Sequence, residues 1–204
     1  MAGGQRRTLF QLTLAAGQLG PEDAPAREAV VAGIRSFIDA AQEHADHEDR
    51  YLGPLHVEAG TATAVKLHAD HAALKAELAA LQKAADAAVA APSPALDLTL
   101  YRALARFTGE YLAHVDLEES SMAELWARHD DATLAAVQGR LVAAHRPHVV
   151  QYNLSTMLPA ASSGERVRFL GGLKHTMPPP VFERVRGQIA ALLEPREWAA
   201  IDAA

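Results

Sequence analysis

Two histidine–glutamate pairs are the residues of this sequence whose types and spacing could do chemistry. His44 and Glu48 lie four positions apart, and His114 and Glu118 repeat that spacing 70 positions later. On a helix, residues four apart project from one face, one turn from each other. Imidazole and carboxylate groups together suit Fe, Mn and Zn ions. The two pairs are therefore candidate metal ligands presented by two helices.

The apolar residues that precede each pair indicate that both pairs point into a protein interior. A stripe of this kind packs into the core of a helical bundle. A carboxylate there loses its hydration, which costs several kcal/mol unless the charge is paired. Two such carboxylates would also repel each other, and a divalent cation between them resolves both problems. The stripes are Val30, Ile34, Phe37 and Ala41 before the first pair, and Leu100, Leu104, Phe107 and Tyr111 before the second.

A third expected helix, over residues 63–89, contributes two more histidines. His71 lies on its apolar seam, and His68 lies one turn earlier on the edge of that seam. A single histidine on a seam is more often a hydrogen-bonded core residue than a ligand. The two histidine–glutamate pairs shift the interpretation of His71 toward a ligand, whereas His68 is equally consistent with a solvated position.

Composition limits the other possibilities. The chain has 204 residues, is half apolar and carries a net charge of −6 without any block of like charge, which argues against nucleic acid as a main partner. It contains no cysteine, so a metal site must use imidazole, carboxylate or phenol. The sequence shows neither a signal-peptide pattern nor an uncharged apolar run of the ~18–20 residues that cross a bilayer. We therefore expect a cytoplasmic protein that does not enter a membrane.

The pattern of helix formers and breakers predicts an all-α protein. Helices are expected at about 8–19, 26–52, 63–89 and 96–129, and shorter ones follow after residue 130. No period-2 run of β-branched residues predicts a strand. We interpret residues 1–129 as a four-helix bundle and residues 130–204 as a C-terminal helical extension packed on it.

These motifs resemble the hemerythrin-like (HHE cation-binding) family over roughly residues 5–128. The similarity rests on the two His-xxx-Glu motifs, the segment Glu48–Leu55 and the segment Leu67–Leu74 with its Asp70-His71. It implies an antiparallel four-helix bundle that holds a non-haem di-iron centre. Glu48 and Glu118 would be the bridging carboxylates, and His44, His71 and His114 the terminal ligands.

The sequence departs from this family pattern in its first helix, which normally contributes a histidine. Residues 8–19 contain none, and the nearest polar candidates are Gln5, Gln11 and Gln18. The candidates to replace this histidine are His47, His68 and Tyr51. Tyr51 is included because a phenolate is a hard ligand for ferric iron. Alternatively, His47 could form a hydrogen bond to a ligand carboxylate instead of binding the metal, and Tyr51 could be a packing residue at the end of the bundle. The site as a whole could also be a mononuclear iron site or a zinc site. His56 and His129 are expected to be structural, and His145 and His148 could reach the open end of the bundle.

The resemblance implies a protein that binds or reacts with O2, NO or peroxide at iron. Two alternatives from other classes stay open. The same iron could make the chain a peroxidase-type or oxidase-type enzyme, or the site could be degenerate or hold zinc in a regulatory module whose extension binds a partner. The sequence offers no Ser-His-Asp arrangement, Gly-rich phosphate loop or cysteine nucleophile as a competing catalytic site.

Overall fold

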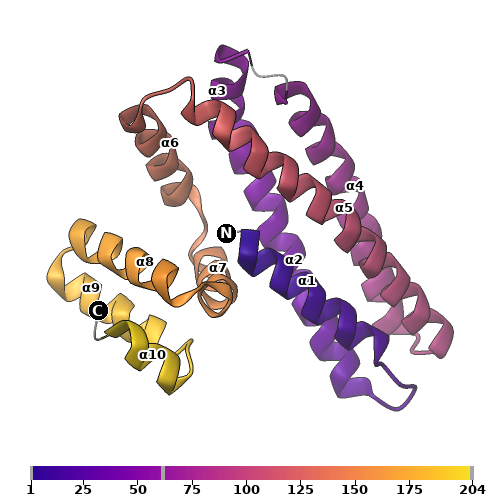
Figure 1. The fold of residues 1–204 in the computed structure, drawn as a ribbon. Coiled ribbons are helices and arrows are strands. Elements are labelled where there is room, and N and C mark those ends of the chain that lie inside the picture. The colour runs from indigo at the N-terminus through magenta and orange to yellow at the C-terminus, as the bar shows by residue number, and fades with distance from the viewer. Residues whose placement is uncertain (1, 61–62, 203–204) are drawn as a thin grey trace. The chain divides into compact units, whose positions relative to one another are not determined.

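A computed structural model describes residues 2–60 and 63–202 and shows an all-helical protein (Figure 1). No strand occurs within these two ranges. None of the helices described there combines the length and apolar character that a membrane span requires. The helices are α1 (Ala2–Gly17), α2 (Ala24–Tyr51), α3 (Gly53–Glu58), α4 (Ala64–Ala90), α5 (Pro94–Trp126), α6 (Asp131–Ala144), α7 (Pro147–Ala160), α8 (Ser163–Thr176), α9 (Pro179–Ala190) and α10 (Pro195–Asp202).

The chain divides into two compact units, which are described separately below. One consists of residues 9–149, and the other of residues 1–8 with 150–204. Both boundaries fall inside helices, α1 and α7. The structure thus groups α6 with the helices of the expected bundle. The predicted division at residues 129 and 130, and the packing of residues 130–204 on the bundle, stay predictions.

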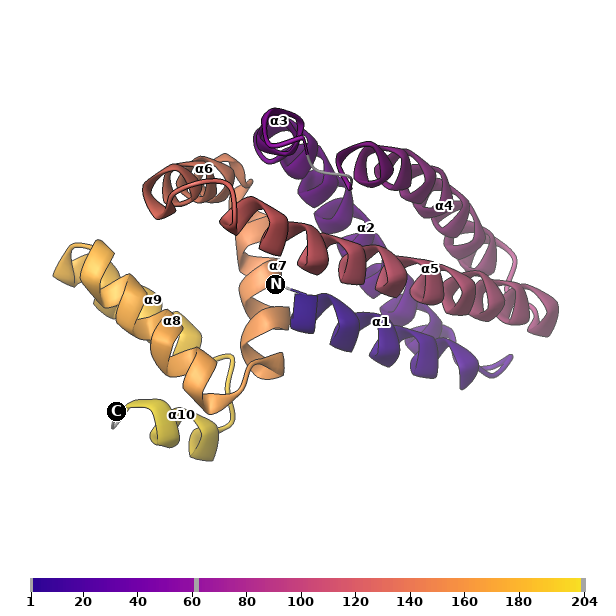
Figure 2. The ribbon, with the colours of Figure 1, turned by 45° about the horizontal axis from the view of Figure 1, so that its top comes forward.

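The unit of residues 9–149 is a helical bundle built on three long helices. Helix α4 packs against both α2 and α5, and Figures 1 and 2 show α4 and α5 side by side. The predicted apolar stripes form the core, because Ile34 on α2, Leu78 on α4 and Leu104 on α5 are all at most 2% exposed. Apolar burial of this kind stabilises the packing by roughly 1.5–3 kcal/mol per large side chain.

An aromatic cluster next to the histidine–glutamate pairs ties α2 to α5. The ring of Phe37 packs edge-on against Phe107 at 5.9 Å and against Tyr111 at 5.3 Å between centroids. Such edge-to-face pairs have a preferred geometry, so they define the relative position of the two helices. Phe37 lies about two turns before His44, and Tyr111 lies just under one turn before His114. The cluster therefore holds the two motifs opposite each other.

The first helix joins the bundle through small and hydroxyl side chains. Leu9 is fully buried, and Thr13 shares a hydrogen bond of 3.1 Å with Thr108 on α5. A Cβ atom at Gly33 on α2 would lie only 2.7 Å from the side chain of Leu12, so this glycine permits the close approach of the two helices. These contacts position α1 against α2 and α5 without placing any metal-binding group of residues 9–17 in the interior.

A buried ion pair joins α2 to α5 near the start of both helices. Arg27 donates from Nε and Nη2 to the two carboxylate oxygens of Asp97, at 2.7 Å each. Arg27 also donates to the carbonyl of Gly20, at 2.9 Å. A bidentate pair has a fixed planar geometry. It therefore sets the register of α2 against α5.

The unit formed by residues 1–8 and 150–204 has a core of its own. Arg166 is buried there and donates hydrogen bonds to the carbonyl of Leu158 and to the carboxylate of Glu197. Helix α8 begins with a capping box between Ser162 and Glu165. The buried apolar residues of this core are Leu158, Leu170, Phe182, Ile189, Leu193 and Ile201.

Candidate metal centre

Three helices of the bundle bring the predicted ligands together. Helix α2 provides His44 and Glu48, α4 provides His71, and α5 provides His114 and Glu118. His44, His71 and His114 are each at most 9% exposed, and the side chains of Glu48 and Glu118 are 14% and 15% exposed. The prediction that both glutamates turn inward from the apolar stripes is therefore confirmed.

The distances within this group are short enough for one shared cation site. His114 Nε2 lies 2.6 Å from Glu118 Oε1, and His71 Nε2 lies 3.4 Å from Glu48 Oε2. One ligand atom from each of Glu48, His71, His114 and Glu118 lies within 4.8 Å of the others. His44 stands at the edge of the group, with its Nε2 3.4 Å from Glu48 Oε1 and 4.0 Å from Glu118 Oε2.

Two aspartates outside this group face the Nδ1 atoms of His71 and His114, the ring nitrogens that point away from the glutamates. Asp49 Oδ1 lies 2.7 Å from Nδ1 of His71 and accepts its hydrogen bond. Asp70 Oδ2 lies 3.9 Å from Nδ1 of His114, beyond hydrogen-bond distance. A carboxylate behind a ligating imidazole fixes the tautomer and raises its basicity as a ligand. Asp49 thereby directs the Nε2 atom of His71 toward the two glutamates.

The electrostatics of the group show how strongly its charges interact. Burial raises the pKa of the Glu48 carboxyl, and the nearby Glu118 adds to that rise. Burial would also raise the pKa of Glu118, but its contacts with His114 and His71 outweigh burial and lower it. Burial lowers the pKa of His71, whereas its contacts with Glu118, Glu48 and Asp49 prevail and raise it to about 10. In the absence of a cation, the proton that His71 holds at neutral pH offsets part of the charge of the two glutamates.

Several buried polar atoms of the group have no hydrogen-bond partner among the described residues. They include His71 Nε2 and Glu48 Oε2, which are 3.4 Å apart but are not oriented to bond. A buried polar atom without a partner costs about 1–3 kcal/mol. A cation coordinated by both atoms would remove this cost. The donor set of imidazoles and carboxylates therefore fits a first-row transition metal, as the sequence predicted.

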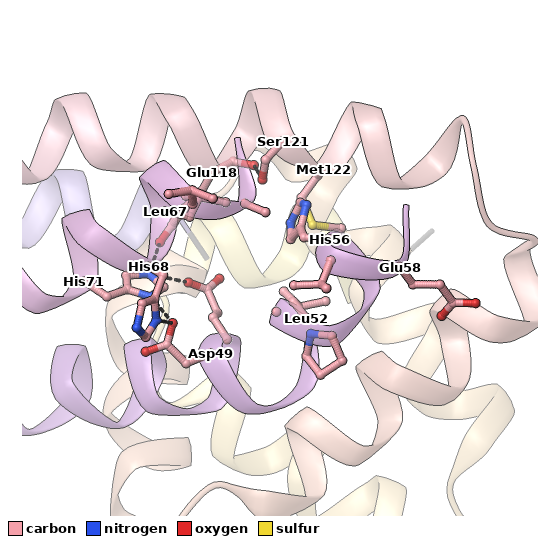
Figure 3. Close-up of a pocket in the computed structure, with 16 residues that line it drawn as sticks. Asp49, Leu52, His56, Glu58, Leu67, His68, His71, Glu118, Ser121 and Met122 are labelled. Atoms are coloured by element: carbon pink, nitrogen blue, oxygen red, sulfur yellow. Dashed lines mark hydrogen bonds and ion pairs between the residues drawn. The ribbon is translucent and has the colours of Figure 1, made fainter. Parts of the chain in front are cut away.

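A pocket of about 680 Å³ borders this group (Figure 3). Glu48, His71 and Glu118 form one part of its wall, and the rest is mainly apolar. His56, from α3, is only 4% exposed, and burial lowers its pKa, so it is an uncharged imidazole at neutral pH. Leu52, Leu67 and Met122 are among the apolar residues that line it.

The structure does not bring the three substitute ligands into this group. The side chain of His68 is 80% exposed, with its Nδ1 3.4 Å from Asp49. Tyr51 packs against the apolar cluster of Leu55, Leu125 and Val137, and its ring lies 5.8 Å from that of His47. Tyr51 therefore has the packing environment that was its alternative interpretation. Gln11 on α1 and Gln18, just after the end of α1, are exposed and offer no replacement either.

Other residues at or near the centre were not predicted. The sequence places Asp49 next to Glu48, but adjacent residues point about 100° apart on a helix, so nothing in the sequence indicated its contact with α4. His56 was expected to be structural, yet it lines the pocket. His47 was predicted as a substitute ligand of the main centre, and the structure instead groups it with Glu43 and His145 as a second set of possible ligands. The four-residue spacing of Glu43 and His47 was a signal for two of its three members.

Taken together, the fold and this site define an all-helical protein with an interior histidine–glutamate cluster suited to a cation. The model of the hemerythrin HHE cation binding domain matches residues 4–126, and the chain belongs to this family. No curated protein and no solved structure gives a significant match. The match covers α1 to α5 and all five predicted ligands of the main group.

Proposed function

We propose that this chain is a non-haem iron protein that binds or reacts with O2, NO or peroxide. The iron would be held by Glu48, His71, His114 and Glu118, with His44 completing the set, in an antiparallel four-helix bundle. The observation that carries the proposal is the convergence of four ligand atoms within 4.8 Å, from three helices, in a domain of a cation-binding family. Iron, when bound, would supply coordination positions for a small ligand.

The donor set supports a di-iron centre as the first expectation. Two carboxylates can each bridge a pair of ions, and Glu48 and Glu118 face each other across the group. Three imidazoles then remain as terminal ligands. The absence of a histidine in residues 2–17 leaves at least one coordination position without a protein donor from α1. That position is where we place the exogenous ligand; a mononuclear iron site and a zinc site are the competing outcomes.

The chain's own residues would protect and tune this position. Asp49 holds the imidazole of His71 in one tautomer, which favours coordination through Nε2. Leu52, Leu67 and Met122 give the pocket beside the glutamates an apolar wall. An apolar wall keeps bulk water from a reactive adduct and strengthens the electrostatic interactions inside.

Iron loading followed by exposure to gases tests this proposal. The purified chain is loaded with Fe(II) without oxygen, and its absorption spectrum is recorded before and after addition of air and, separately, of NO. We expect new visible absorption with each gas in the wild type and its loss in Glu118→Gln. His68→Ala is the matched control, because this exposed histidine lies beside the centre but outside the ligand group, and it should behave like the wild type. Spectra that do not change in the wild type would contradict the proposal.

The size of the pocket favours an enzyme as the second candidate function. A volume of about 680 Å³ is in the range of sites that hold organic molecules and exceeds what a diatomic gas needs. His56 would be a neutral proton donor or acceptor within it. The discriminating experiment is peroxide consumption with and without an organic reductant: turnover that depends on the reductant and is lost in Glu118→Gln favours the enzyme. Stable adduct formation without turnover favours the binding protein.

A further inference from the structure

A second group of histidine and glutamate residues lies in the same unit, outside the centre described above. Glu43 and His47 are one turn apart on α2, and His145 is the residue that ends α6. One ligand atom from each of the three lies within 4.8 Å of the others. Glu43 and His145 are 102 positions apart in the chain, so only the packing of α6 on α2 creates this group.

The hydrogen bonds of Glu43 determine which nitrogen of His145 is free. Glu43 Oε1 lies 3.0 Å from His145 Nδ1 and also accepts from the backbone N–H of Arg146 at 2.9 Å. Arg146 Nε donates to the other carboxylate oxygen. A carboxylate that already accepts two hydrogen bonds from Arg146 is ionised, so His145 Nδ1 is the donor to it. In the neutral imidazole, His145 Nε2 therefore carries the lone pair and is the nitrogen open to a metal ion.

This lone pair is buried and has no acceptor role among the described residues. The side chain of His145 is only 5% exposed, and its Nε2 has no hydrogen-bond partner. The Nδ1 atom of His47 is likewise buried without a partner. The two rings lie 4.7 Å apart between centroids and are tilted by 46°. Two imidazoles that each have a buried, unused nitrogen at this distance are an arrangement that a metal ion would complete.

We propose that His47 and His145 bind a divalent ion that prefers imidazole, such as Zn²⁺, Ni²⁺ or Cu²⁺, at a site separate from the main centre. Glu43 orients His145 from behind, as carboxylates do in many histidine–metal sites. A cavity of about 300 Å³ reaches Glu43 and His47 and gives room for the ion's water ligands and for its entry. The site does not depend on the proposed function of the main centre.

The nearest fixed positive charge does not oppose such an ion. Arg146 is the cation beside Glu43, and it also donates to Asp39 at 2.6 Å. One guanidinium is therefore shared between two carboxylates, which leaves the surroundings with no excess of positive charge. Asp46 lines the same cavity, and its exposed side chain is paired with Lys75 at 2.7 Å, so this pair adds no net charge there.

Binding of this ion would tie the connector between α6 and α7 to α2. His145 and the next residue lie between the two helices, and in the metal-free protein this connector is held by Arg146, His145 and His148 through Glu43 and Asp39. A metal bond between His47 and His145 would add a link between the same elements. The ion would therefore slow backbone hydrogen exchange in residues 141–149 as well as occupy the site.

Zinc stoichiometry in the full-length chain tests this inference. The parent is the double variant His114→Gln with Glu118→Gln, which disables the main centre, and bound zinc is measured after equilibrium dialysis. We expect the parent to retain one equivalent, and addition of either His145→Gln or His47→Gln to abolish it. His148→Gln is the matched control, because this imidazole lies in the first turn of α7, three residues after His145, but is 62% exposed and bonded to Asp39, and it should retain the ion.

Two further measurements keep the result decisive. Circular dichroism reports whether each variant is folded; if His145→Gln is not, His47→Gln decides, because its Nδ1 atom has no hydrogen bond to lose. In a background with the main centre intact, each of the two substitutions should lower bound zinc by one equivalent. Retention of zinc by both variants, or no zinc in the parent, would overturn the second site. Failure of the iron spectra alone would affect only the proposed function.

Discussion

Asp49 Oδ1 lies 2.7 Å from Nδ1 of His71, and this contact connects the surface of α2 to the interior of the metal centre. His71 is 3% exposed, whereas the Asp49 side chain is 25% exposed and also interacts with Lys75 at 3.7 Å. The aspartate therefore stands at the boundary between solvent and ligand. It determines which nitrogen of His71 faces the two glutamates.

Replacement of Asp49 by Asn should weaken metal binding without removing the site. The amide can no longer hold His71 as a charged acceptor does, and loss of such a partner typically lowers metal affinity by about 10–100-fold. Competition with a chelator measures the change. His68→Ala is the control, because Nδ1 of His68 lies 3.4 Å from the same Asp49 Oδ1 atom but its side chain is exposed. The metal affinity of this variant should stay within about twofold of that of the wild type. Equal affinities for Asp49→Asn and wild type would exclude the role assigned to Asp49.

Replacement of Glu48 by Gln should stabilise the metal-free protein while it weakens metal binding. Burial and the nearby Glu118 raise the pKa of Glu48, so the metal-free fold loses stability as the pH rises from the ordinary value of 4.5 through the raised pKa. A neutral amide of the same shape avoids this cost. We expect the melting temperature without metal to rise by a few degrees, and the increase caused by metal to shrink. Thermal unfolding with and without chelator measures both, and a less stable metal-free variant would contradict the account.

Metal affinity should rise with pH, because the ion must displace a proton from His71. The pKa of His71 is raised to about 10 in the metal-free protein, so this imidazole is protonated at neutral pH. Each step upward in pH removes competing protons, and the apparent affinity for Mn²⁺ should increase by up to about tenfold per pH unit between pH 7 and 8.5. Calorimetry in buffers of different ionisation enthalpy should show proton release. An affinity that does not change with pH would exclude a protonated His71.

The same raised pKa gives the metal-free protein an opposite dependence on pH. Because His71 binds its proton more tightly in the folded state, its contribution to stability is complete below the unfolded value of 6.5 and is lost as the pH rises through about 10. The metal-free chain should therefore unfold at a lower temperature at pH 10 than at pH 7. In the variant His71→Gln, the melting temperature should fall less between pH 7 and pH 10 than in the wild type. An equal fall in both proteins would show that other groups cause the pH dependence.

Loss of Asp97 should destabilise the bundle far from the metal centre. Its removal leaves the buried guanidinium of Arg27 without its bidentate partner. We expect Asp97→Ala to lower the melting temperature by roughly 10 °C. The exposed ion pair of Arg35 and Asp86 provides the matched control. Asp86→Ala should change the melting temperature by no more than a few degrees. Similar effects of the two substitutions would show that the buried pair does not set the register of α2 and α5.

The periodicity of the sequence was sufficient to predict the long helices and the faces that they bury. The expected ranges for α2, α4 and α5 agree with the structure to within three residues at each end, because apolar stripes and proline positions are local signals. The same stripes correctly placed His44, Glu48, His114 and Glu118 in the interior. Burial of a helix face is encoded in its own segment, so it needs no knowledge of the partner helix.

Contacts between helices could not be predicted in this way. The apolar seam of α4 already placed His71 inward and His68 at the edge, as the structure shows, but it did not specify which side chains of α2 and α5 His71 would meet. The partnership of Glu43 with His145 depends on how α6 returns to α2, and no local pattern specifies that return. Asp49 was unnoticed for the same reason. The residues around a centre are set by tertiary packing, whereas the ligand motifs are set by helical spacing.

Iron content after anaerobic loading and exhaustive dialysis tests the central claim most directly. The wild type should retain between one and two equivalents of iron per chain, and the double variant Glu48→Gln with Glu118→Gln should lose them while it remains helical by circular dichroism. The variant His145→Gln, compared alongside, reports any iron at the second site. A wild type that retains no iron, or a double variant that retains as much as the wild type, would contradict a metal centre built on these two glutamates.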